Sequence, residues 1–137
     1  MKLDDVSPRV RALLATRIDS FEKLELIIAL HGEPRATSTF DQMCERLGVA
    51  RHLLREAAVS LNADSLVQMT SGGELQLLPP TDRDREAIGE LVALYSDDRM
   101  AVVKALGEIA LDRIRNMASK VFADAFVIRK NKDDEHG

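Results

Sequence analysis

Residues 39–62 read TFDQMCERLGVARHLLREAAVSLN, which predicts two short helices separated by a tight turn. Thr39 and Gln42 stand three positions apart, the spacing of a capping box in which each side chain accepts the backbone N–H of the other residue. Gly48 ends the first helix, because glycine tolerates the left-handed conformation that stops a helix. The second helix then begins near Arg51.

This second helix is strongly amphipathic. At 100° per residue, its leucines and most of its alanines gather on one side and its charged and polar residues gather on the other. The apolar side consists of Leu53, Leu54, Ala57, Ala58 and Leu61. The opposite side consists of Arg51, His52, Arg55, Glu56, Val59, Ser60 and Asn62. We expect the first side to pack on a core and the second to face solvent or a partner.

The chain that follows changes from helical to alternating periodicity. Residues 66–69 and 74–78 predict two short strands, and Thr70-Ser71-Gly72-Gly73 between them supplies the glycines that a hairpin turn needs. Towards the N-terminus, helices are predicted from Pro8 and from Phe21, each directly after a capping serine. The predicted fold class is therefore mainly α with a small two-stranded β-hairpin and long C-terminal helices.

Residues 81–130 predict a C-terminal helical region with one helix to about Tyr95 and a longer one from about Arg99 to Ile128. Apolar residues of the longer helix recur every three or four positions, and so long a seam is typical of a helix that packs against a partner chain. Residues 131–137 are polar and are predicted to form a disordered tail. The candidate dimerisation residues are Val103, Leu106, Ala110, Ile114, Met117 and Val121.

The order of helix, helix, glycine turn, helix and hairpin resembles the winged helix-turn-helix of MarR-type bacterial regulators. The resemblance places a winged helix-turn-helix with an N-terminal helix in residues 1–80, the helix-turn-helix itself at about 39–62, and the wing at about 66–78. The runs RMAVV at 99–103 and FADAFVIRK at 122–130 are also similar to small uncharacterised proteobacterial winged-helix proteins.

The resemblance implies a DNA-binding transcriptional regulator that acts as a homodimer. It makes residues 51–62 the recognition helix, which enters the major groove of double-stranded DNA. The wing would then lie against the phosphate backbone. The implied DNA contacts are Arg51, His52, Arg55 and Asn62 from the helix, and Thr70, Ser71, Gly72 and Gly73 from the wing.

The charge of the chain keeps a second function open. Its 137 residues carry 19 Lys and Arg against 23 Asp and Glu, a net charge of −4 that excludes a protein coating nucleic acid indiscriminately. The wing has no Lys or Arg, Glu74 follows its turn, and Glu56 shares the helix side of the arginines. The alternative is a winged-helix adaptor that binds a protein without significant DNA binding. A regulator with a small-molecule pocket beside the C-terminal helices is a third hypothesis.

A basic run outside the motif has two interpretations. Six cations lie between Arg113 and Lys132, where Asp124 is the single acid. Cations are favourable near the C-terminus of a helix, which alone accounts for the run. The functional interpretation is a contact with the DNA backbone or an acidic partner.

No motif predicts chemistry. One cysteine, Cys44, and three scattered histidines provide no local metal-ligand spacing, and no catalytic constellation stands out. Cys44 lies on the apolar side of its helix and is interpreted as a core residue. We therefore expect no enzymatic activity, no cofactor and no metal. The lone cysteine and the lack of an apolar run of about 20 residues favour a cytoplasmic protein without a membrane partner.

Overall fold

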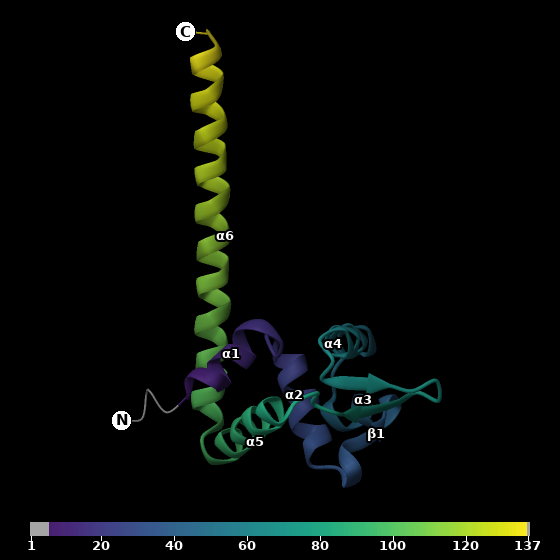
Figure 1. Cartoon of the computed structure of the whole chain (residues 1–137). Coiled ribbons are helices and arrows are strands. Elements are labelled where there is room, and N and C mark those ends of the chain that lie inside the picture. The colour runs from purple at the N-terminus through teal and green to yellow at the C-terminus, as the bar shows by residue number, and fades with distance from the viewer. Residues whose placement is uncertain (1–5, 137) are drawn as a thin grey trace.

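A computed structural model describes the backbone of residues 6–136 and the side chains of residues 6–125. This part of the chain is mainly helical, with six α-helices and a small three-stranded antiparallel sheet (Figure 1). In chain order the elements are α1 (Pro8–Thr16), α2 (Phe21–His31), a 3-10 turn (Pro34–Ala36), β1 (Thr37–Thr39), α3 (Phe40–Leu47), α4 (Arg51–Ala63), β2 (Val67–Met69), β3 (Glu74–Leu77), α5 (Asp82–Asp97) and α6 (Arg99–His136).

Four helices begin at a capping side chain, and three of these caps, at Ser7, Ser20 and Thr39, are predicted from the sequence. The side chains of Ser7, Ser20, Thr39 and Thr81 each accept the backbone N–H three residues further on. At α3 the capping box is complete, because the Gln42 side chain also accepts the N–H of Thr39. Gly48 follows α3 with a φ of 65°, which is the left-handed conformation that glycine was expected to adopt there.

The core is built around α2, which packs against α3, α4 and the sheet. Leu54, Ala57, Ala58 and Leu61 of α4 are buried as predicted, whereas Leu53 is 39% exposed. On the other side of the molecule α1 packs against α5 and the first turns of α6. Ion pairs support that contact, with Arg17 2.6 Å from Asp84 and Arg9 2.6 Å from Glu90. One continuous core thus joins helices α2, α3 and α4 to α5 and the first turns of α6.

The prediction of a two-stranded hairpin was incomplete, because β1 adds a third strand. The strand order is β1-β3-β2, with Ser38 opposite Leu75 and Gln68 opposite Gln76. The chain turns into β1 through Arg35 and Ala36, which have φ values of 56° and 52°. Only three residues long and polar, β1 carries no periodicity that would reveal it.

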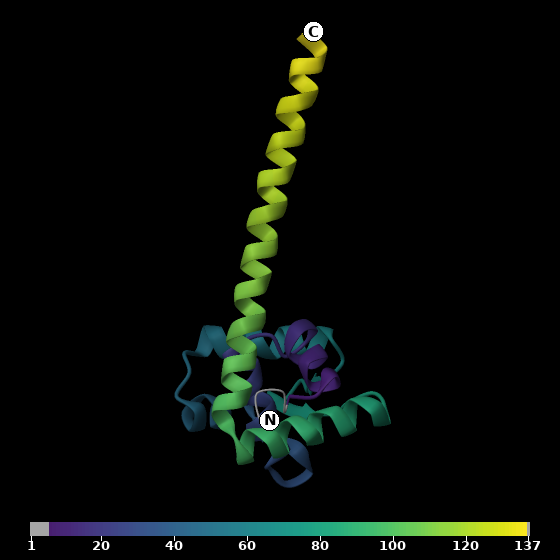
Figure 2. The same ribbon diagram turned by 90° about the vertical axis from the view of Figure 1, so that its left-hand side faces the viewer.

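Helix α6 leaves the body of the molecule and projects far beyond it, as Figures 1 and 2 show from two directions. Its first turns are held in the core by Val102, Ala105 and Leu106, whereas every side chain from Ala110 to Ala125 is exposed. The helix continues to His136, so the disordered tail predicted for residues 131–137 is helical as far as that residue. The helix contains no proline, and its one glycine, Gly107, does not break it; Gly137 lies outside the described residues.

No helix in the described part of the chain is long and apolar enough to cross a membrane.

Candidate nucleic-acid interface

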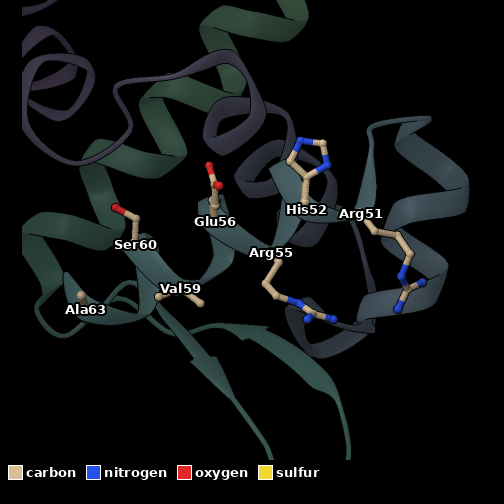
Figure 3. A pocket seen from close by; sticks show the side chains of 7 residues that line it. All are labelled: Arg51, His52, Arg55, Glu56, Val59, Ser60 and Ala63. Carbon is tan, nitrogen blue, oxygen red and sulfur yellow. The ribbon is translucent and has the colours of Figure 1, made fainter.

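One face of α4 is open to solvent along its whole length. Seven residues on this face line a shallow hollow of about 600 Å3 (Figure 3). They recur at intervals that keep them on the same side of the helix, opposite the buried leucines. The lining residues are Arg51, His52, Arg55, Glu56, Val59, Ser60 and Ala63.

A second groove, of about 520 Å3, joins this face to the β2–β3 turn. Arg51 and Arg55 line it from α4, the first residues of α3 line a second side, and the β2–β3 turn lines a third. Its lining residues are Thr39, Phe40, Asp41, Arg51, Arg55, Met69, Thr70, Gly72, Gly73 and Glu74. In Figure 3, Arg51 and Arg55 extend towards the hairpin, while His52 and Glu56 extend away from it.

Backbone contacts fix the turn relative to the helices. The Phe40 N–H donates to the carbonyl oxygen of Gly73 at 2.9 Å, which connects the start of α3 to the turn. Within the turn, the Thr70 hydroxyl accepts the N–H of Glu74 at 3.1 Å. Gly73 has a φ of 84°, a conformation that a residue with a side chain would adopt only under strain. The groove therefore has a defined shape on both sides.

The half-buried ring of Phe40 orients both arginines. The guanidinium carbon of Arg51 lies 5.0 Å from the ring centroid and that of Arg55 lies 5.6 Å from it. Both distances are within the range of cation–π attraction. The sequence gives no signal for this contact, because it joins the starts of two different helices.

Asp41 competes for one of these arginines. Its carboxylate lies 2.8 Å from Nη1 of Arg51, in a pair whose side chains are 59% exposed for Arg51 and 79% exposed for Asp41. The hydrogen bond to Asp41 raises the pKa of Arg51 above its usual value, so the guanidinium keeps its charge. Across the two grooves, the cations Arg51 and Arg55 face three anions, Asp41, Glu56 and Glu74.

Most of the residues implied as DNA contacts lie on this surface. Arg51, His52 and Arg55 are exposed side by side on α4, and Thr70, Gly72 and Gly73 line the groove at the β2–β3 turn. Ser71 is exposed in the same turn but does not line the groove.

Asn62, the remaining residue implied as a DNA contact, makes a hydrogen bond within the fold. Its Nδ2 donates to the carbonyl oxygen of Val67 at 2.9 Å, which connects the end of α4 to β2. The amide group thus supports the fold at the far end of α4 from Arg51.

The basic run after residue 112 is partly engaged with the chain itself. Arg113 donates to Asp19 at 2.9 Å and also to the carbonyl oxygen of Ala15, so it fixes α6 to the last turn of α1 and to the loop that follows. Arg115 lies 3.6 Å from Asp112. The side chains of Arg129, Lys130 and Lys132 lie outside the described residues.

Among the residues whose side chains are described, no group of three or more His, Cys, Asp or Glu is placed to hold a metal ion. Cys44 is half-buried and packs against the core.

Comparison with known proteins finds no family model, no curated protein and no solved structure that matches this chain.

Proposed function

We propose that the chain is a bacterial transcriptional regulator that binds double-stranded DNA as a homodimer through a winged helix-turn-helix. In this proposal α3 and α4 are the two helices of the motif, and the β2–β3 turn is the tip of the wing. One observation carries the proposal: Arg51, His52 and Arg55 are exposed on one face of α4, and the wing borders the same groove.

The first two turns of α4 would supply the contacts that depend on DNA sequence. A recognition helix places its N-terminal residues against base edges in the major groove. Arg51 and Arg55 lie one turn apart, and each guanidinium group can make a bidentate contact with guanine or a contact with phosphate. Phe40 limits the conformations of both side chains, so less freedom is lost when they bind. The exposed backbone of the wing would contact phosphate.

The acidic residues in this surface set the expected strength of binding. DNA affinity depends largely on the phosphates that a protein neutralises. Because Asp41, Glu56 and Glu74 outnumber the two arginines, each protomer would bind a random duplex weakly. A second protomer would double the number of contacts, which supports binding as a dimer.

The proposal is tested by fluorescence anisotropy of a labelled duplex of mixed sequence, titrated with the full chain at low and then rising salt. We expect binding that weakens with salt, and the double variant Arg51→Ala/Arg55→Ala should reduce the slope of log affinity against log salt by about 2 to 4, since each protomer of the homodimer loses one or two phosphate contacts. The matched control is Arg83→Ala/Arg85→Ala on α5, which removes the same charge from another part of the body. Equal losses in both double variants, or no binding at low salt, would contradict the proposal.

An adaptor that binds a protein is the second candidate, and the composition of the same surface favours it. Val59 is 53% exposed and Met69 is 42% exposed, so apolar side chains border the charged groups. Exposed apolar side chains bordered by polar residues are typical of protein-binding surfaces. An intact chain that binds no duplex even at low salt would favour this candidate.

A further inference from the structure

An apolar stripe runs along α6 on the side that faces away from the body. Six of its large side chains are strongly exposed, from 47% for Leu111 to 75% for Phe122, and Val103 near the base is partly buried. At about 100° per residue, the stripe is centred about 140° around the helix from the face that packs on α1 and α5. Its members are Met100, Val103, Gly107, Ala110, Leu111, Ile114, Met117, Ala118, Val121, Phe122 and Ala125.

The stripe corrects the seam predicted from the sequence. Leu106 was expected on it, but its side chain is 7% exposed and belongs to the core beneath α6. Met100, Leu111 and Phe122 were not expected on it, and Met100 and Phe122 are its two most exposed large side chains. The base of the helix therefore uses one face for the protein's own core and presents a different face to solvent.

A helix that projects alone is poorly supported. Isolated helices are marginal in water, and most helical stability in proteins comes from packing of an apolar face. Between Ala110 and Ala125 this chain offers α6 no such packing, because every side chain there is exposed. Arg113 holds the base of this segment against Asp19, which fixes its direction but covers no apolar surface.

We infer that a second copy of this chain lies along the stripe, with its own α6 as the partner helix. From Gly107 to Ala125 the stripe carries no charge, so two identical faces meet without like charges opposed. Apart from the neighbouring helix backbone, no atom of the chain lies within 4 Å of the place where a Cβ of Gly107 would be, so the fold does not require a glycine there. A bare backbone at that point allows a second helix to approach closely.

The apolar area of the stripe and the position of the remaining domain on the other side of α6 both fit a second copy of the chain. At roughly 80 Å2 for each large side chain, the six exposed ones and the small residues between them would bury about 1,000 Å2 over both chains, near the lower limit for a specific interface. These six are Met100, Leu111, Ile114, Met117, Val121 and Phe122. Since each body packs on a face of α6 turned away from the stripe, the two bodies lie outside the helix pair. This inference specifies the interface of the homodimer in the proposed function and requires no DNA.

Sedimentation velocity of the full chain over a range of micromolar concentrations tests the inference. The wild type should sediment as a dimer, and Ile114→Glu/Val121→Glu should weaken self-association about 100-fold or more, because it buries carboxylates in the interface. The matched control, Asn116→Glu/Ala123→Glu, places the same charges on the opposite side of the same exposed segment and should remain a dimer. Circular dichroism checks that the body is folded in each protein, since none of these four residues lies in the core.

A wild type that stays monomeric throughout this range, or a stripe variant that dimerises as well as the control, would overturn the inference. Monomeric wild type that co-sediments with phosphatidylserine-containing vesicles would also overturn it, in favour of a membrane surface as the occupant. Because these measurements contain no DNA, their failure is distinct from failure of the DNA-binding proposal. A monomer that still binds duplex through Arg51 and Arg55 would retain that proposal and remove only this interface.

Discussion

Replacing Asp41 with asparagine should strengthen DNA binding. In the free protein the carboxylate of Asp41 pairs with Arg51 at 2.8 Å and also places a negative charge at the rim of the groove. Asp41→Asn removes that charge and leaves the Arg51 guanidinium available, while Phe40 still holds it in place. Both side chains of the ion pair are exposed to solvent, so loss of the pair should leave the free energy of unfolding nearly unchanged.

The magnitude follows from counting phosphate contacts. If the change adds one contact per protomer, and so two in the homodimer, the slope of log affinity against log salt steepens by about 1.8, which corresponds to about a 60-fold gain at 0.1 M relative to 1 M salt. Anisotropy titrations of a mixed-sequence duplex at several salt concentrations measure both the gain and the slope. The gain should vanish as the salt approaches about 1 M.

Asp82→Asn is the matched control for this experiment. Asp82 also lies in the first turn of a helix and also makes an exposed ion pair, at 2.7 Å from Arg85. It lies on α5, outside both grooves, so its substitution should give little of the gain. If Asp41→Asn leaves the affinity unchanged, or if Asp82→Asn raises it equally, the reasoning about Arg51 is wrong.

Three further predictions concern the scaffold. Leu54→Ala should lower the free energy of unfolding by about 2–5 kcal/mol, whereas Leu53→Ala on the exposed edge of α4 should cost less than about 1 kcal/mol, as urea titration followed by circular dichroism would measure. Thr39→Ala removes the capping hydroxyl of α3 and should cost about 0.5–2 kcal/mol in the same assay, with equal stability arguing against the capping box. The hydrogen bond from Arg17 lowers the pKa of Asp84. The pair therefore stabilises the fold at a pH above the usual carboxyl pKa, and this stabilisation is lost as the pH falls through the lowered pKa of Asp84. Asp84→Asn should accordingly make the free energy of unfolding depend less on pH in the acid range.

Helices and their starting points could be predicted from the sequence because their signals are local. Thr39 and Gln42 are three residues apart and satisfy each other's backbone, so no distant part of the chain is needed to place α3. The exposed and buried sides of α4 also follow from spacing alone, with Leu53 at the border between them. Strand β1 could not be predicted, because its pairing with β3 connects residues far apart in sequence.

The spacing of apolar residues in α6 could not show whether an apolar face packs on the chain's own core or is exposed. In α6, Leu106 and Ile114 both fit a spacing of three and four, but Leu106 packs into the chain's own core and Ile114 is 66% exposed. The difference arises because α1 and α5 reach only the first turns of the helix. The sequence shows which positions of α6 are apolar, but it does not show how far along the helix the rest of the protein packs against them.

The candidate site was partly predictable for the same reason. The exposure of Arg51 and Arg55 follows from their position on α4, but the contribution of Phe40 and Asp41 depends on how the Gly48 turn brings the starts of α3 and α4 together. The hydrogen bond from Asn62 to the backbone of Val67 could not be predicted either, because it depends on how β2 lies against the end of α4.

Mapping the DNA-contacting surface by NMR tests the central proposal most directly. The ¹⁵N-labelled full chain is titrated with a mixed-sequence duplex at low salt, and the change of each backbone amide signal is recorded. The proposal predicts that the largest changes lie at the start of α4, at the first turn of α3 and in the β2–β3 turn, and that they disappear in Arg51→Ala/Arg55→Ala. An unchanged spectrum, or changes confined to α5 and α6, would contradict it.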